Sequence, residues 1–127
     1  MSIKIRKNPN DIIILYHGTS KYNAKLLLNN GWEPNKVKSG PNNGQPKYLY
    51  LTTEPEDALW FAKQIKEKTV LEIKVPIDYL IVDPEDGYKN TVEEELLNSK
   101  KSRFPAKLAL TKSLSADNFE IFKSLKS

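Results

Sequence analysis

The chain contains no cysteine and a single histidine, His17. The lack of cysteine excludes disulfide bonds, cysteine metal sites and cysteine nucleophiles, and it fits a reducing compartment. One histidine without cysteine does not supply the set of ligands that zinc prefers in proteins. We therefore expect no metal in the functional site.

Long apolar runs are also missing. No run approaches the roughly 20 residues that a membrane helix needs. The basic segment 1–10 precedes an apolar run from Ile12 to Leu15, which is much shorter than the about 7–15 residues of a signal-peptide core. We therefore expect a cytoplasmic protein that does not bind membranes.

Arginine is scarce, because the 20 basic residues comprise 18 lysines and only Arg6 and Arg103, and the formal net charge is +4. A modest excess of lysine is typical of a soluble surface, and it also favours the approach of an anionic ligand such as a dinucleotide or RNA. The sequence has no Walker loop, no dinucleotide-binding glycine fingerprint and no nucleophile-elbow motif. The length of 127 residues fits a single domain, 1–127, around one core.

The residue pattern predicts an α+β fold. Strands are expected over 12–16, 47–52, 69–75, 79–82, 107–110 and 119–122, and helices over 22–30, 53–68 and 91–99. This order lacks the regular alternation of a doubly wound fold, so we expect antiparallel sheets with helices early in the chain.

Local signals mark the ends of the first two helices. Ser20 is expected to cap the first helix, and Gly31 is expected to end it. Thr53 and Glu56 form a capping-box pattern at the start of the second helix. The buried face of that helix is expected to comprise Ala58, Phe61, Ala62 and Ile65.

Two further segments carry structural expectations. Residues 12–16 are apolar without alternation, which predicts a strand that is buried on both faces. Residues 32–46 contain several prolines, glycines and asparagines, and they are expected to form a long loop of the kind that is often functional or mobile.

The stretch Tyr16-His17-Gly18-Thr19 is the first candidate site. A lone histidine is most often structural, but His17 is placed where an apolar run meets a glycine. Gly18 allows the backbone to approach a ligand closely, and Thr19 adds a hydroxyl group. A strand that ends in this way can hold a polar ligand.

The strand expected over 47–52 provides the second candidate. Strict alternation places Tyr48, Tyr50 and Thr52 on one face. Tyrosines on a strand usually serve packing, but a row of aromatic side chains also suits stacking against a flat ring.

Acidic residues provide the third candidate. Asp83 follows a short strand in an Asp-Pro step, for which turn formation is the ordinary explanation. The run from Glu93 to Glu95 has an ordinary explanation too, as the solvated start of a helix.

Together these segments resemble the ADP-ribosyltransferase superfamily, whose motifs are a histidine on an early strand, a tyrosine on a later strand and an acidic residue further on. Tyr16-His17-Gly18-Thr19 is similar to the first motif. Residues 49–53, followed by 56–62, are similar to the second motif and its helix. The pattern resembles the small, single-domain bacterial kind that includes rifampicin ADP-ribosyltransferases, in which Ala58-Leu59-Trp60 has a counterpart. The resemblance covers roughly residues 11–86.

The resemblance implies an ADP-ribosyltransferase-like α+β fold of split antiparallel β-sheets with helices, with NAD as co-substrate in the cleft between them. His17 would hydrogen-bond a ribose hydroxyl, the backbone of Gly18 would hold the nicotinamide carboxamide, and Tyr50 would stack on the nicotinamide ring. The residues expected to contact NAD are His17, Gly18, Thr19, Tyr48 and Tyr50.

His17, Tyr50 and Asp83 are the expected catalytic residues, and Asp83 would stabilise the sugar cation or orient the acceptor. Asp86, Glu93 and Glu95 are alternatives for the acidic position. Many relatives place a glutamate just before a late strand, but the corresponding stretch, near 107–110, contains no acid.

The implied function is transfer of ADP-ribose to a protein, a nucleic acid or a small molecule, by a monomeric enzyme that acts as a toxin, an effector or a drug-modifying enzyme. Three alternatives stay open: an RNA 2′-phosphotransferase, an NAD glycohydrolase and a non-catalytic NAD-binding module. The phosphotransferases rely on additional arginines, and this chain has only two.

Overall fold

The computed structural model describes residues 11–34, 48–84, 91–102 and 104–123, and it shows an α+β fold as predicted. The elements are β1 (Ile12–Ser20), α1 (Lys21–Asn30), β2 (Leu49–Thr52), α2 (Pro55–Phe61), β3 (Lys68–Pro76), β4 (Leu80–Val82), α3 (Val92–Ser102), β5 (Lys107–Leu110) and β6 (Phe119–Ile121). Short 3-10 turns precede β4 and β6, at Ile77–Tyr79 and Ala116–Asn118. No helix in the described part of the chain is long and apolar enough to cross a membrane.

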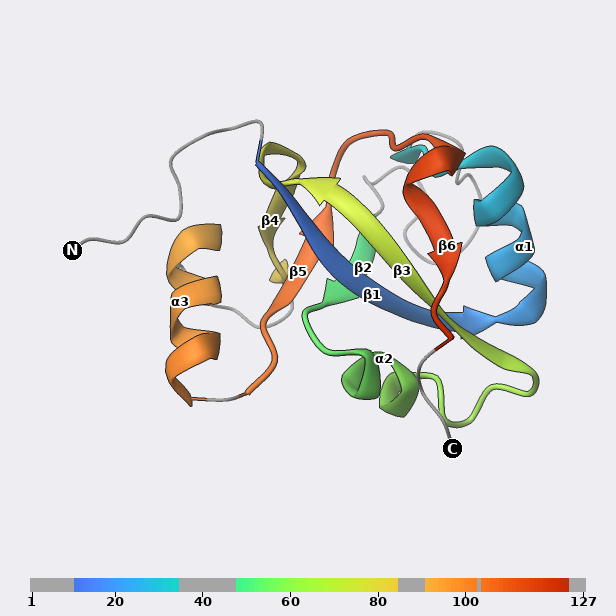
Figure 1. The fold of residues 1–127 in the computed structure, drawn as a ribbon, viewed down its shortest axis with the longest axis horizontal. Helices are drawn as coiled ribbons and strands as arrows, with labels where there is room; N and C mark the ends of the chain where they lie inside the picture. Colours follow the sequence, from blue (N-terminus) through green and yellow to red (C-terminus); the bar gives the residue numbers. More distant parts are fainter. Residues whose placement is uncertain (1–10, 35–47, 85–90, 103, 124–127) are drawn as a thin grey trace.

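The six strands form an antiparallel sheet in the order β4-β5-β2-β1-β3-β6 (Figure 1). β1 and β3 pair along nine residues each, whereas β1 and β2 share a single pair, Tyr16 with Thr52. The sheet therefore consists of two halves, β4-β5-β2 and β1-β3-β6, that are joined at one residue pair.

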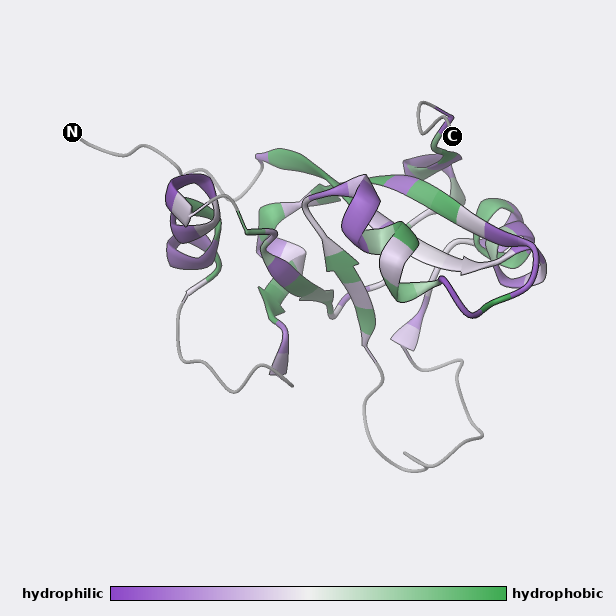
Figure 2. Ribbon diagram, turned by 90° about the horizontal axis from the view of Figure 1, so that it is seen from below, coloured by the Kyte–Doolittle hydropathy of each residue, from purple (hydrophilic) through white to green (hydrophobic). Residues whose placement is uncertain are grey.

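The helices are distributed around this sheet. α1 lies beside the β1-β3-β6 half, α2 packs against β1 and β3, and α3 lies at the opposite end beside β4 (Figure 1). Figure 2 shows hydrophobic residues along the central strands and mostly hydrophilic residues on α3. The largest fully buried side chains are Leu15, Leu71, Ile73, Val75, Leu108 and Leu110, which come from both halves of the sheet.

β1 differs from its prediction in two ways. It continues past Tyr16 to Ser20, so His17 and Gly18 lie inside the strand instead of at its end. The expectation of burial on both faces is wrong, since Ile12 is 54% exposed and Ile14 is 46% exposed. The long pairing with β3 explains the extension, because it supplies backbone hydrogen bonds well beyond the apolar run.

The caps of α1 are those that the sequence predicts. The Ser20 hydroxyl accepts a hydrogen bond from the backbone N–H of Asn23 at 3.1 Å. Gly31 ends the helix with φ = 73°, a conformation that glycine adopts without strain. Ala24 is buried, and Leu27 and Leu28 pack against the core, so the expected apolar stripe is confirmed.

The prediction for α2 is wrong at both ends. The N-cap is Glu54, not Thr53, and the helix ends at Phe61. The hydroxyl of Thr53 accepts a hydrogen bond from the N–H of Ala106 at 2.9 Å, so it serves the neighbouring strand segment instead of a capping box. Ala58 and Ala62 are buried as expected, but Phe61 is 57% exposed.

A capping box does occur at α3. The Thr91 hydroxyl accepts from the N–H of Glu94 at 3.1 Å, and the Glu94 carboxylate accepts from the N–H of Thr91 at 2.9 Å. The remaining strand predictions are confirmed, with small differences at their ends.

Most of the loop expected over 32–46 lies outside the described residues, which stop at 34 and resume at 48. Its first residue is part of the core. Trp32 is buried, and its backbone forms a bridge with Leu114 through two hydrogen bonds of 2.9 Å.

Gly18 fixes how closely α2 approaches the sheet. A Cβ atom at this position would overlap the carbonyl oxygen of Ala58 and would lie 3.1 Å from the Cβ of Ala62. Because the first of these contacts is to helix backbone, a larger residue could fit only if α2 moved. The glycine is therefore required by packing, apart from any contact with a ligand.

Gly18→Ala is expected to lower the free energy of unfolding by about 1–3 kcal/mol, the usual cost of forcing an extra methyl group into a packed site. Urea denaturation of the two proteins measures this difference. An unchanged midpoint would show that α2 does not pack on Gly18 as described.

Candidate functional site

A pocket of about 260 Å³ lies where β1 and β2 separate. We call it the histidine pocket. Its lining comprises Tyr16, His17 and Gly18 of β1, Tyr50, Leu51 and Thr52 of β2, Ala58 and Phe61 of α2, and Asp83 and Lys107. Residues that are distant in the sequence thus meet at the junction between the two halves of the sheet.

The alternation of backbone hydrogen bonds shows which groups of β1 face the gap. In an antiparallel ladder, successive residues direct their N–H and C=O groups to opposite neighbours. At the two ends of the β1–β3 pairing, the C=O of Asp11 accepts from Ile77, and the N–H of Lys21 donates to Glu67. The odd-numbered residues of β1 therefore bond β3, and the even-numbered residues face the β2 side.

Tyr16 is the even-numbered residue that pairs with β2. Gly18, two residues later, faces the same side, but the ladder has already ended and Gly18 has no paired residue there. Its N–H and C=O are therefore directed into the gap that the histidine pocket occupies.

His17 spans this gap with its side chain. The Nδ1–H of its imidazole donates a hydrogen bond to the backbone C=O of Tyr50, with 2.8 Å between the heavy atoms. A carbonyl oxygen can only accept, so Nδ1 carries the proton, and Nε2 of the neutral ring is an acceptor. The hydrogen bond fixes both the tautomer and the orientation of the ring.

Burial lowers the pKa of His17 below its ordinary value, because the charged imidazolium loses solvation, and the hydrogen bond to Tyr50 offsets only part of this effect. The imidazole is therefore neutral at neutral pH. A neutral ring with Nδ1 engaged is suited to accept a hydrogen bond at Nε2, and it is poorly suited to donate a proton in catalysis.

The predicted NAD contacts separate into two groups. His17, Gly18 and Tyr50 line the histidine pocket, whereas Thr19 and Tyr48 are not among its lining residues. The ring of Tyr50 is 39% exposed, and the ring of Tyr48 packs edge-on against it with 6.3 Å between centroids. Tyr48 thus contacts Tyr50 from outside the pocket, and Thr19 is buried.

Asp83 is the predicted acid that the structure brings to the pocket. It directly follows β4, and its N–H donates to the C=O of Lys107 at 3.1 Å, which extends the β4–β5 ladder by one residue. Glu93 and Glu95 lie on α3 and do not line the pocket. Asp86 lies outside the described residues.

Six lining residues were not predicted as site residues, and two of them, Lys107 and Phe61, contact each other at the pocket. The Lys107 ammonium lies 5.0 Å from the centroid of the Phe61 ring, a distance typical of a cation–π contact. The sequence predicted Phe61 as part of the buried face of a helix and Lys107 as part of a strand. The early end of α2 brings Phe61 to the pocket, and the pairing of β5 with β2 brings Lys107 there.

A scan against protein-family models found no match for this sequence, and a search of curated proteins found none either. The chemistry of the histidine pocket therefore follows from its own residues. They offer an acceptor nitrogen, a backbone donor and acceptor, an exposed aromatic ring, a carboxylate and an ammonium group. In the described part of the chain, no three histidine, aspartate or glutamate residues are grouped so as to hold a metal ion.

The lowered pKa of His17 predicts a loss of stability in mild acid. The unfolded chain, with an ordinary histidine pKa of about 6.5, binds a proton more readily than the folded chain. The free energy of unfolding should therefore be fully present above about pH 6.5 and should fall as the pH decreases from there towards the lower pKa of the folded state.

His17→Asn should reduce this dependence, because its amide can still donate to the Tyr50 carbonyl but does not titrate. Urea unfolding at about pH 7.5 and about pH 5.5, above the range in which ordinary carboxylates titrate, isolates the effect. Equal pH dependence in the two proteins would contradict a neutral, partly buried imidazole at this position.

Proposed function

We propose that this protein is an NAD-dependent ADP-ribosyltransferase that binds the nicotinamide–ribose part of NAD in the histidine pocket. The observation that supports this most strongly is that His17, Gly18, Tyr50 and Asp83, from three strand segments, line one pocket at the gap between β1 and β2. These are the residues to which the resemblance assigns recognition of NAD and catalysis.

The backbone of Gly18 suits the carboxamide of nicotinamide. A carboxamide carries one carbonyl acceptor and N–H donors, as a peptide group does, so it can pair with a strand edge. The N–H and C=O of Gly18 face the position at which the β1–β2 ladder has ended. The carboxamide would take the place of the missing strand partner, and the ring of Tyr50 would stack on the pyridinium.

His17 suits the ribose. With Nδ1–H bonded to the Tyr50 carbonyl, Nε2 would accept a hydrogen bond from a ribose hydroxyl and fix the position of the sugar. Orientation of this kind contributes to catalysis because the reacting carbon is held in a reactive geometry before the barrier is crossed.

The chemical step requires stabilisation of positive charge. Cleavage of the bond between the ribose C1′ and the pyridinium nitrogen leaves the bonding electron pair on nitrogen, so neutral nicotinamide departs without a proton donor. Positive charge develops on the ribose as an oxocarbenium ion, and the carboxylate of Asp83 would stabilise it until a nucleophile of the acceptor bonds to C1′.

The size of the pocket fits part of a dinucleotide. Sites for drug-sized ligands usually have volumes of about 300–1,000 Å³, whereas the histidine pocket measures about 260 Å³. The nicotinamide–ribose part would fill the pocket, and the diphosphate and adenosine would extend beyond it. The ammonium of Lys107 supplies the positive charge in the lining that a diphosphate requires.

Purified protein should consume NAD and release nicotinamide. His17→Ala should lower the rate by about 10²–10³, the usual effect of removing one preorganised polar group, and Tyr50→Ala should also lower the rate, because the stacking ring is lost. Tyr50→Ala retains the backbone carbonyl that holds His17, so it tests ring stacking alone. Chromatography of the reaction products measures turnover.

Tyr22→Ala is the matched control, because Tyr22 is a tyrosine on α1 that is 71% exposed and does not line the pocket. It should leave turnover unchanged. If all three variants consumed NAD at the rate of the parent protein, the histidine pocket would not be the site. Mass spectrometry of the products separates transfer from hydrolysis, because only transfer leaves ADP-ribose on an acceptor.

A further inference from the structure

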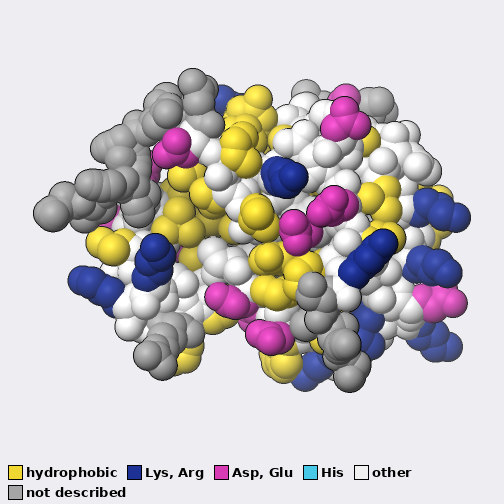
Figure 3. Space-filling view, viewed as in Figure 1, with side chains coloured by type: hydrophobic (Ala, Val, Ile, Leu, Met, Phe, Trp, Pro, Cys, Tyr) yellow, Lys and Arg dark blue, Asp and Glu magenta, His cyan; other side chains and the backbone are white. Residues whose placement is uncertain are grey.

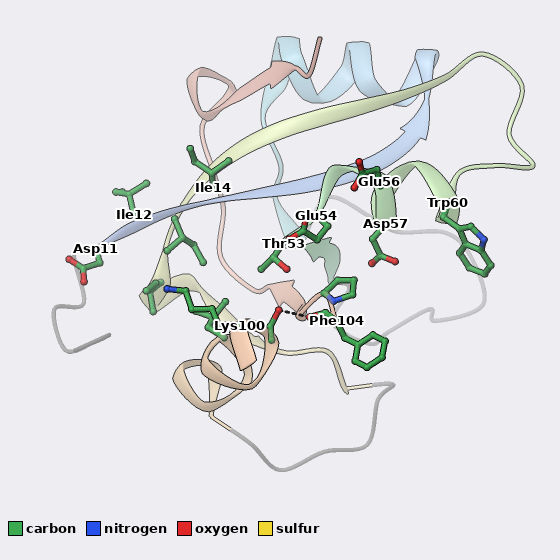
Figure 4. A pocket seen from close by; sticks show the side chains of 15 residues that line it. Asp11, Ile12, Ile14, Thr53, Glu54, Glu56, Asp57, Trp60, Lys100 and Phe104 are labelled. Carbon is green, nitrogen blue, oxygen red and sulfur yellow. Dashed lines mark hydrogen bonds between the residues drawn. The ribbon is translucent and has the colours of Figure 1, made fainter. Parts of the chain in front are cut away.

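A second and larger opening lies on the other side of the β1–β2 junction. We call it the isoleucine groove; its volume is about 1260 Å³. Asp11 and the first three residues of β1 form one wall, α3 and residues 104–105 form the opposite wall, and the segment 53–60 closes one end (Figure 4). The groove does not share a lining residue with the histidine pocket.

Several large apolar side chains that line the groove are exposed. Ile12 and Ile14 are 54% and 46% exposed, and the aromatic rings of Trp60 and Phe104 are 58% and 71% exposed. Figure 3 shows hydrophobic side chains gathered between α3 and β1. Exposed apolar side chains gathered along one groove often mark a site of interaction.

The wall formed by β1 is also a strand edge that is uncovered as far as the described residues go. Ile12 and Ile14 are even-numbered residues of β1, so their N–H and C=O groups face away from β3 and towards the groove. β2 would cover them if it continued, but after Thr52 the chain leaves the sheet and enters α2. No described residue pairs with Ile12 or Ile14 on this side.

The charge around the groove is predominantly negative. Its lining contains the carboxylates of Asp11, Glu54, Glu56 and Asp57 and a single ammonium group, that of Lys100. This is the reverse of the net charge of the whole chain, +4. Figure 4 shows Glu54, Glu56 and Asp57 along one side of the groove, with the Asp57 carboxylate directed towards the side that carries Phe104.

The carboxylate of Asp57 is a further feature of the groove that points to a bound partner. Its Oδ2 atom is shielded from solvent and has no hydrogen-bond partner among the described residues. A buried carboxylate oxygen without a donor is unfavourable, because its lost solvation is not compensated. A donor from a bound partner, and an ammonium or guanidinium group above all, would satisfy it.

From these observations we infer that the isoleucine groove binds an extended polypeptide segment that carries basic and apolar side chains. The segment adds a strand to β1 through the backbone of Ile12 and Ile14. Its basic side chains meet Glu56 and Asp57, and its apolar side chains cover the exposed isoleucines. This binding does not depend on NAD, so it holds or fails separately from the activity of the histidine pocket.

The test uses a short synthetic peptide of alternating valine and lysine as the probe, with a peptide of alternating valine and glutamate as its matched control. Amide hydrogen exchange of the full chain, followed by NMR, should show slower exchange at Ile12 and Ile14 when the lysine peptide is added. Ile13 is the internal control, because its N–H already bonds β3 and should change little. The glutamate peptide should have no such effect.

Charge variants test the inferred contacts of the peptide's basic side chains with Glu56 and Asp57. Glu56→Gln combined with Asp57→Asn should weaken binding of the lysine peptide by about twofold to thirtyfold, the range expected for two partly exposed ion pairs. The control, Asp117→Asn combined with Glu120→Gln, removes two exposed carboxylates outside the groove and should not change binding. Glu56→Lys, at an exposed position, repeats the test if the double variant is unstable.

Several outcomes would overturn the inference. Equal binding of both peptides would contradict the inferred role of charge. Binding without slower exchange at Ile12 and Ile14 would contradict the inferred addition of a strand to β1. Protection that rises with protein concentration and needs no peptide would identify a second copy of this chain as the occupant. Protection at every concentration without peptide would mean that the edge is already covered.

Discussion

The early end of the ladder between β1 and β2 is the constraint on which the rest of the structure depends. One pair, Tyr16 with Thr52, joins the two halves of the sheet. Beyond it, the imidazole of His17 reaches across the gap and donates to the carbonyl of Tyr50 at 2.8 Å. A side chain thus replaces a strand-to-strand hydrogen bond, and the backbone of Gly18 is left facing a pocket instead of a partner.

The same ladder borders both the histidine pocket and the isoleucine groove. β1 has nine residues and β2 has only four. Even-numbered residues of β1 therefore extend past the junction in both directions. On one side Gly18 faces the histidine pocket, and on the other Ile12 and Ile14 face the isoleucine groove. α2 lies between them and, because Gly18 has no side chain, it packs directly on β1. The two sites are therefore structurally linked while their chemistry differs.

The sequence predicted the helices and strands better than the tertiary contacts between them. Alternation and capping signals are local, so the strand at Tyr50 and the caps Ser20 and Gly31 were predictable. The exposure of Ile12 and Ile14 was not, because an apolar run does not reveal that its neighbouring strand stops short. Thr53 matches a capping-box pattern, but its hydroxyl accepts a hydrogen bond from the N–H of Ala106 instead of capping the helix. Of the site, His17, Gly18, Tyr50 and Asp83 were predicted and meet in one pocket. Lys107 joins them through the pairing of β5 with β2, and Phe61 joins them because α2 ends early.

The most direct test of the central claim is the behaviour of the Gly18 amide when NAD is added. We propose that the carboxamide of nicotinamide hydrogen-bonds the backbone of Gly18, whereas the neighbouring Thr19 amide already faces β3. Titration with NAD, followed by amide NMR, should shift the Gly18 signal and slow its hydrogen exchange, with little change at Thr19. Saturating NAD that left Gly18 unchanged, or that shifted only residues outside the histidine pocket, would contradict the account.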